Sequence, residues 1–286
     1  MTGPGSRLGG GLGGGGIGGW AEPWAGGAVG GHAICVLAPN PGPLTLDGTN
    51  TWVLAAAGGR AVVVDPGPAD GAHLDRVLAA ATEGGRRLAM VLLTHGHADH
   101  AEGARALAER AAAPVRALDP ACRLGDEGLA GGDVVEVDGL EVRVVATPGH
   151  SGDSLSFALP ADGALLTGDT VLGRGTSVVA HPEGRLGDYL DSLRRLQDES
   201  AALGLRLLLP GHGPALGDLP GVLAAYLAHR EERLAQVAAA VAEGRTSVES
   251  VLASVYAEVD RALWPAAALS VAAQLEYLGV RTAAGG

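Results

Sequence analysis

The sequence contains no lysine, and all 20 of its basic residues are arginine, against 32 acidic residues. The formal net charge of −12 repels phosphate backbones at long range, so a nucleic-acid partner would need a local basic patch. Aromatic residues are also scarce, at 3% of the chain, while hydrophobic residues reach 47% and are dominated by Ala, Val and Leu. We therefore expect an aliphatic core.

Cysteine is equally rare, because only Cys35 and Cys122 occur, far apart and outside any C-x-x-C spacing. This argues against a disulfide or a sulfur-ligated metal and favours free thiols in a reducing compartment. No run of about 18 apolar residues offers a membrane span, and the start of the chain lacks the charged and apolar blocks of a signal peptide. We expect a cytoplasmic protein with no membrane partner.

Glycine, in contrast, is abundant at 47 residues, and much of the excess lies near the start. Residues 1–31 include GGGLGGGGIGGW, which cannot bury enough side chain to offset the entropy of ordering it. We expect a disordered tail over 1–31, a main domain over 32–219 and a small helical domain over 220–286. The second boundary lies where the sequence changes character, after Pro220.

The main domain alternates short apolar runs with turns and helical patterns. Hairpins are predicted at residues 58–59 and 138–139, and amphipathic helices over 72–83 and around LGDYLDSLRRLQ. Adjacent strands broken by helices indicate stacked sheets flanked by helices, an α/β (α+β) fold.

The last part of the chain, from Val222 to Leu278, has the pattern of three helices. In the middle one, Thr246 and Glu249 have capping-box spacing, and the last begins near Pro265. At about 65 residues this region is near the lower limit for independent folding, so we expect it to dock on the main domain.

The clearest chemical signal is VLLTHGHADH, in which three histidines and an aspartate lie within six residues after an aliphatic run. Further donors follow three other short aliphatic strands, in TPGHSGD, LLTGDT and LLPGHGP: they are His150, Asp169 and His212. Glycine beside each donor lets the backbone approach a bound ion closely. Imidazoles and carboxylates at this density suit a borderline-soft divalent ion, first of all zinc, and they exceed what one four-coordinate zinc uses.

Each of these donors also has an ordinary structural interpretation. A single histidine after a strand is more often a hydrogen-bonded edge residue, and an aspartate in a Gly-Asp pair is usually a turn former. Four donor sites at strand ends in one chain favour the metal interpretation, because the specificity lies in the set.

This set resembles the metallo-β-lactamase superfamily, an αββα sandwich, over roughly residues 33–219. The resemblance implies one metal held by His95, His97 and His150, a second held by Asp99, His100 and His212, and Asp169 bridging both. It implies two zinc ions, with iron or manganese as alternatives. VVVDPG is similar to the family's early aspartate motif, which implies that Asp65 orients a ligand. The di-iron flavoprotein branch usually carries a carboxylate at the position of His97, so the chain resembles the hydrolytic members.

A closer resemblance, over most of residues 36–280, is to the β-lactamase-like protein 2 group. It rests on NPGPLTLDGTNTWVL, TGDTVLGRGT, GDYLDSLRRL and YLAHREER. Members of this group include an endoribonuclease and thioesterases of polyketide pathways. The resemblance therefore implies hydrolysis and leaves the substrate class divided.

Two divalent ions about 3.5 to 4 Å apart can share a water and lower its pKa to about 7, which makes a metal-bridging hydroxide available at neutral pH. Asp99 and Asp169 are the expected catalytic carboxylates, which partly neutralise the metals and orient the nucleophile. We expect a dinuclear zinc hydrolase acting on a small thioester or other activated acyl substrate, like hydroxyacylglutathione hydrolase, because a thiolate departs without a proton.

Three other functions stay open. A phosphodiesterase or endoribonuclease is permitted by the family, although RNA is disfavoured by charge. A single-iron persulfide dioxygenase uses three of the same histidines. The helical region is compatible with a winged-helix-like docking element for a partner.

Four residues are weaker candidates for substrate contacts. Asn50 and Thr51 lie in GTNTW, where they are equally typical of a turn before a strand. His181 and Tyr189 are conceivable proton donors, with a surface loop and helix packing as their ordinary interpretations.

Overall fold

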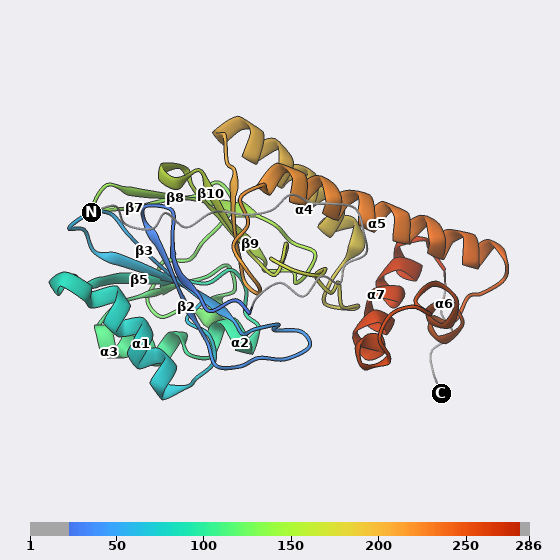
Figure 1. Cartoon of the computed structure of the whole chain (residues 1–286), viewed down its shortest axis with the longest axis horizontal. Coiled ribbons are helices and arrows are strands. Elements are labelled where there is room, and N and C mark those ends of the chain that lie inside the picture. Colours follow the sequence, from blue (N-terminus) through green and yellow to red (C-terminus); the bar gives the residue numbers. More distant parts are fainter. Residues whose placement is uncertain (1–22, 281–286) are drawn as a thin grey trace, which may run out of the picture.

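Two β-sheets lie face to face in the computed structural model, which describes residues 23–280 (Figure 1). The first sheet has the order β1-β2-β3-β4-β5-β6 and the second β11-β10-β9-β8-β7. The first comprises β1 (Gly27–Val29), β2 (Ala33–Leu37), β3 (Asn50–Ala55), β4 (Ala61–Val64), β5 (Leu88–Leu92) and β6 (Val115–Arg116). The second comprises β7 (Val134–Val137), β8 (Leu140–Ala146), β9 (Leu155–Leu159), β10 (Ala164–Gly168) and β11 (Leu207–Pro210).

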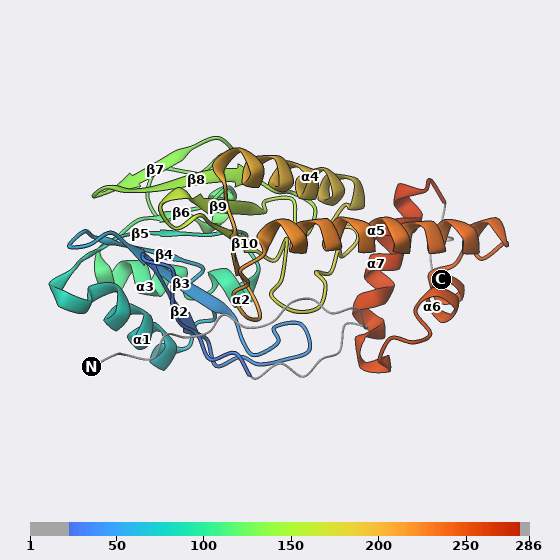
Figure 2. The same cartoon turned by 45° about the horizontal axis from the view of Figure 1, so that its top comes forward.

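Helices cover the outer faces of both sheets and extend the molecule at one end. They are α1 (Gly71–Thr82), α2 (Ala98–Ala101), α3 (Ala104–Ala111), α4 (Leu186–Leu203), α5 (Leu219–Ala242), α6 (Val248–Val255) and α7 (Trp264–Tyr277). Figures 1 and 2 show α1 and α3 beside the first sheet and α4 beside the second. The predicted αββα arrangement is confirmed.

The alternation of side chains along the strands builds three layers of core. In β4, Val62 and Val64 face the second sheet, while Val63 faces α1 and α3. The layer between the sheets is largely Val and Leu, with Trp52 and Phe157 as its large aromatic members. The expected aliphatic core is therefore present. Because it packs the two sheets against each other, it fixes their relative position at the edge where the donor residues emerge.

The C-terminal helices differ from one another in what they pack against. The first half of α5 shares a core with α4, through Leu219, Leu223 and Tyr226. Its second half packs with α6 and α7 around a separate cluster that includes Val251 and Val271. Figure 2 shows α5 running from α4 toward α6 and α7. Whether 220–286 forms a domain of its own stays a prediction.

Two sequence-based details need correction. The cap of α6 is Ser247, whose side chain accepts a hydrogen bond from the backbone N of Ser250, so the predicted capping box at Thr246 is one residue early. The predicted tail over 1–31 is wrong for its last part, because Gly27–Val29 pairs with β2. Backbone pairing needs no large side chains, which is why glycine content misled the prediction. Residues 1–22 lie outside the described residues.

The structure also bears on the predicted absence of a membrane span. Over residues 23–280, no helix combines the length and the apolar character needed to cross a bilayer.

A buried histidine in α1 generates a prediction about pH. His73 Nε2 lies 3.0 Å from Thr51 Oγ1, and burial together with the charge of Arg76 lowers the pKa of His73 to about 4. An unfolded histidine titrates near 6.5, so between roughly pH 6.5 and 4 the folded protein binds fewer protons than the unfolded chain. The free energy of unfolding therefore falls as the pH drops through this window.

We predict that His73→Gln reduces this pH dependence. Between pH 7 and pH 5 the wild-type protein should lose on the order of 2 kcal/mol more stability than the variant. Urea unfolding of both proteins at several pH values measures the difference. Parallel curves for the two proteins would show that His73 does not carry the effect.

Candidate metal centre

Four loops deliver the predicted donor residues to one edge of the sandwich. The loop after β5 carries His95, His97, Asp99 and His100, the last two within α2. The other three donors follow β8, β10 and β11. Because β10 and β11 are parallel neighbours, the residues after them emerge side by side. The structure brings all seven predicted ligands together.

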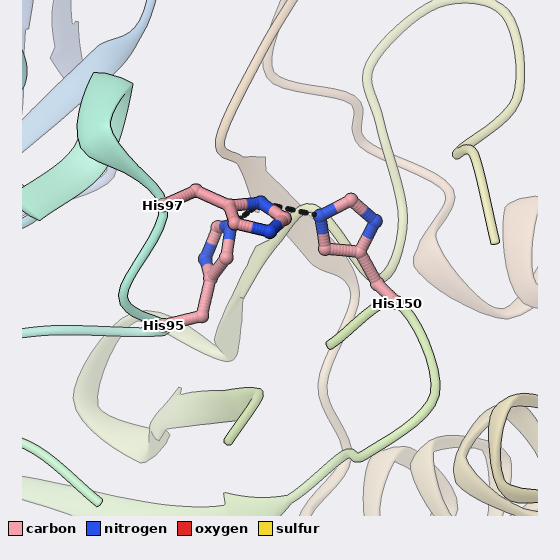
Figure 3. Close-up of side chains that lie close together, drawn as sticks. All are labelled: His95, His97 and His150. Carbon is pink, nitrogen blue, oxygen red and sulfur yellow. Dashed lines mark hydrogen bonds between the residues drawn. The ribbon is translucent and has the colours of Figure 1, made fainter. Parts of the chain in front are cut away.

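The first donor set consists of three imidazole nitrogens that point toward one another (Figure 3). His97 Nδ1 lies 3.0 Å from His95 Nε2 and 3.1 Å from His150 Nε2. Ligands placed tetrahedrally at 2.0 to 2.1 Å from zinc are about 3.3 to 3.4 Å apart. Both distances are close to this spacing, and all three nitrogens lie within 4.8 Å of one another, so a single cation could contact all three.

The second donor set combines two imidazoles with a carboxylate. His212 Nε2 lies 3.2 Å from Asp99 Oδ2 and 3.3 Å from His100 Nε2, and the remaining pair, His100 Nε2 and Asp99 Oδ2, are 3.6 Å apart. These atoms also have ligand spacing, so the edge holds two separate sets.

Asp169 lies between the two sets. Its Oδ2 is 3.8 Å from His150 Nε2 in the first set. Its Oδ1 is 3.4 Å from His100 Nε2 and 3.3 Å from His212 Nε2 in the second set. Within residues 23–280, Oδ1 is buried without a hydrogen-bond partner. A buried acceptor without a partner is costly, and a cation shared with the histidines would satisfy it. The donor set therefore fits a divalent metal.

The outward nitrogen of each histidine faces an oxygen. These contacts are His95 Nδ1 to Thr94 Oγ1 (3.0 Å), His97 Nε2 to Glu183 Oε1 (3.1 Å), His100 Nδ1 to Asp65 Oδ2 (2.9 Å), His150 Nδ1 to Val178 O (2.7 Å) and His212 Nδ1 to Gly48 O (3.2 Å). Donation outward leaves the inward nitrogen of each ring with its lone pair toward the centre. This is the arrangement that metal-ligating histidines adopt in proteins.

Asp65 occupies the place the sequence predicts for a residue that orients a ligand. Its Oδ1 accepts from the backbone N of Thr94 at 2.8 Å, and its Oδ2 accepts from Thr94 Oγ1 at 2.6 Å and from His100 Nδ1 at 2.9 Å. Since Thr94 Oγ1 donates to Asp65, it is free to accept from His95 Nδ1. One buried carboxylate thus orients a histidine in each set.

Charge is distributed unevenly over the centre. Burial opposes ionisation of Asp169, but His212 and His100 outweigh it and hold its pKa well below the usual range. Burial likewise opposes charge on His212, yet Asp169 raises its pKa to about 9. Burial lowers the pKa values of His95 and His150. The raised pKa values of His100 and His212 thus come, against the effect of burial, from the charge of Asp169, and a metal that binds these rings would replace protons on them.

Gly211 shows why glycine accompanies the donors. A Cβ atom added to Gly211 would lie 2.6 Å from Asp169 Oδ1 and 2.8 Å from His100 Cε1. Such an atom would displace both ligands, so only glycine permits this close approach of the backbone.

Three of the four predicted substrate contacts, Asn50, Thr51 and Tyr189, have side chains that are buried inside the protein and bonded to other protein groups, which argues against contact with a substrate. Asn50 Nδ2 donates to Pro210 O at 2.9 Å and to Gly213 O at 2.8 Å. Asn50 thus braces the segment that carries His212. Thr51 pairs with His73 on the far side of the sheet.

Tyr189 and His181 differ in their exposure. The hydroxyl of Tyr189 is buried and donates to Thr170 O at 2.6 Å, so it offers no proton to a substrate. The side chain of His181 is 38% exposed, and its Nε2 lies 3.7 Å from Glu276 Oε2 of α7. A substrate contact by His181 stays a prediction.

Two residues at the centre were missed by the sequence analysis. Thr94 directly precedes the histidine cluster, and a hydroxyl in that place was a usable signal. Glu183 contacts His97 across 86 positions of sequence, from a loop with no recognisable pattern. Only the fold could bring Glu183 to the centre.

Comparison with known proteins is consistent with this geometry. Residues 44–212 match the family model described as "Metallo-beta-lactamase superfamily". The lactamase-like protein adaB of Aspergillus niger is 36% identical over 211 residues, which cover 73% of this chain and 64% of that protein. The match therefore spans less than two thirds of the relative's own length.

Two solved structures share the fold. A metallo-beta-lactamase family protein from Thermus thermophilus has a TM-score of 0.70 at 24% identity and covers 87% of this chain and 93% of that chain. A beta-lactamase domain protein from Burkholderia ambifaria has a TM-score of 0.75 at 24% identity and covers 91% and 90%. Coverage of that extent takes in C-terminal helices as well as the sandwich.

The role of Asp65 gives a prediction about metal affinity. Asp65→Asn leaves one acceptor oxygen where there were two, so the side chain cannot accept from both the backbone N of Thr94 and His100 Nδ1. We expect zinc affinity to fall about 10- to 100-fold, as is usual when an outer hydrogen bond to a ligating histidine is lost. Competition with a chromophoric chelator measures it. The exposed substitution Asp191→Asn is the control, and equal affinities in all three proteins would refute the role of Asp65.

The role of Asn50 gives a prediction about stability. Asn50→Ala leaves Gly213 O without this donor, which should lower the free energy of unfolding by roughly 1–3 kcal/mol. Asn50→Asp should cost more, because a carboxylate would face the two carbonyls. Urea unfolding with chelator present isolates the effect from metal binding. Unchanged stability combined with a raised KM would instead restore a direct substrate contact.

Proposed function

Because the chain belongs to the metallo-beta-lactamase superfamily, we propose that it is a hydrolase that uses two divalent metal ions to cleave a thioester or another activated acyl substrate. Within the superfamily we propose the β-lactamase-like protein 2 group, on the support of the motifs NPGPLTLDGTNTWVL and GDYLDSLRRL. The observation that carries the proposal is the buried carboxylate of Asp169, which presents one oxygen to each of two donor sets.

The chemistry of the donors favours zinc, with iron or manganese as alternatives. One ion would be held by His95, His97, His150 and Asp169, and the other by Asp99, His100, His212 and Asp169. Five imidazoles and two carboxylates suit a borderline-soft cation better than the hard cations Mg²⁺ and Ca²⁺, which prefer oxygen. A complete second set supports two ions rather than one.

Asp99 and Asp169 would have different roles in hydrolysis. When bound, two such cations lower the pKa of a shared water to about 7. The side chain of Asp99 is 32% exposed, whereas those of His100 and His212 are buried, so Asp99 is the carboxylate at the solvent side of the second set. It is placed to orient an incoming water and to accept its proton, while buried Asp169 keeps the two sets together.

Neither cysteine competes for the role of nucleophile. Both are free thiols, as the sequence predicts. Burial raises the pKa of Cys35 to about 12, and burial also raises the pKa of Cys122. Neither is a thiolate at neutral pH, which supports attack by water rather than a covalent acyl-enzyme.

The leaving group supports the acyl substrate. An alkoxide leaving from RNA profits from a general acid. Of the two candidates, Tyr189 is buried with its hydroxyl donated to Thr170 O, and His181 is exposed with its Nε2 3.7 Å from Glu276 Oε2. A thiolate leaves without a proton, so hydrolysis of a thioester requires no general acid. The net charge of −12 further disfavours a polyanionic substrate, so we propose a small thioester and not RNA as the substrate. The two free cysteines support the further proposal of a cytoplasmic setting.

A substrate panel tests the proposal. We expect zinc-loaded protein to hydrolyse acyl-coenzyme A or lactoylglutathione in preference to short RNA. Asp99→Ala should lower kcat/KM by about 100-fold or more, since a metal contributes several kcal/mol of transition-state stabilisation. Chelation should abolish turnover. Asp191→Asn on the exposed face of α4 serves as the control.

Two results would contradict the proposal. One is cleavage of RNA alone, abolished by Asp99→Ala. The other is oxygen consumption with a persulfide by protein that carries one iron per chain.

A further inference from the structure

The segment 170–178 touches the centre at both of its ends. It follows Asp169 directly, and at its other end Val178 O accepts from His150 Nδ1 at 2.7 Å. Ser177 Oγ also lies 3.3 Å from His150 Nδ1. The conformation of this segment therefore determines how the His150 ring is turned.

Three side chains from α4 and α5 hold this segment in place. The hydroxyl of Tyr189 donates to Thr170 O at 2.6 Å. In α5, the hydroxyl of Tyr226 accepts from the backbone N of Leu172 at 2.9 Å and lies 3.0 Å from Gly175 O. Further along the same helix, Arg230 Nη2 donates to Ser177 O.

Arg230 is an unusual residue to find in this place. It is only 5% exposed, its guanidinium lies 5.0 Å from the centre of the Tyr189 ring, and within the described part of the chain its Nε has no hydrogen-bond partner. Burial of a guanidinium without full compensation is costly. Stability alone therefore does not account for it, whereas its contact with the residue next to Val178 does.

We propose that Arg230 and Tyr226 are positioning residues of the metal centre: Tyr226 fixes the segment at Leu172 and Gly175 and Arg230 fixes it at Ser177, so that the Val178 carbonyl orients His150. Helix α5 of the C-terminal region is then part of the centre, as well as the link to α6 and α7. The inference rests on the proposed role of His150 as a ligand.

Cobalt substitution of the full-length protein tests this directly, because the visible spectrum of Co²⁺ reports the geometry of its ligands. The variants are Arg230→Met, which keeps volume but removes the donors, and Tyr226→Phe, which removes one hydroxyl. We expect altered cobalt bands in both and a 10- to 100-fold weaker affinity for one of the two ions. Arg230→Lys should recover the wild-type spectrum in part.

Arg233 offers a matched control one turn further along α5. Its guanidinium lies 4.9 Å from the Tyr256 ring, and its Nη1 donates to Val255 O at 2.8 Å. This is the same kind of contact, but it faces α6 instead of the centre. Arg233→Met should lower the melting temperature and leave the cobalt spectrum unchanged.

The outcomes separate the two proposals. Wild-type protein that binds no divalent ion would overturn the proposed function. If the wild-type protein binds two ions and both Tyr226→Phe and Arg230→Met show the same spectrum and affinities as the wild type, the role of α5 is overturned while the proposed function stands. If Arg230→Met fails to fold, Tyr226→Phe decides the matter, because it deletes a single oxygen atom. A shift of the spectrum in Arg233→Met equal to that in Arg230→Met would also contradict positioning.

Discussion

The buried carboxylate of Asp169 is the constraint on which the rest of the centre depends. A carboxylate removed from water needs positive charge close by, and Asp169 has it from two directions, with one oxygen toward each donor set. Within the protein, His212 and His100 are the groups that hold the pKa of Asp169 low. Metal ions would supply positive charge in the loaded protein. Because one carboxylate contacts both sets, we propose that the two sets bind two cations as one unit.

The fold meets this constraint by gathering support from distant parts of the chain. Asp65 after β4 orients His100, and the backbone carbonyls of Gly48 and Val178 orient His212 and His150. Asn50 braces the His212 segment and is itself bound by Trp24 Nε1 at 2.8 Å. Trp24, early in the described chain, thus supports the centre through Asn50, and α5 contacts the segment that leads to Val178.

The fold and most of the donor residues could be predicted from the sequence, because their signals lie in residues that are neighbours along the chain. Donors directly after short aliphatic strands have a position fixed by the strand, so His95, His150, Asp169 and His212 were identifiable from their flanking residues. Polar residues whose partners lie far away in sequence were not. Asn50 and Thr51 have the composition of a turn, yet they are buried against Pro210 and His73. The contact of Arg230 with Ser177 spans 53 positions, and no periodicity encodes it.

The central proposal is that the two donor sets, joined by Asp169, hold two cations. Anomalous diffraction from crystals of the protein, recorded at the zinc and iron edges, would decide this. We predict two zinc peaks, one among His95, His97 and His150 and one among Asp99, His100 and His212, with Asp169 between them. A single iron peak within the three-histidine set, with the second set empty, would contradict a centre for two cations.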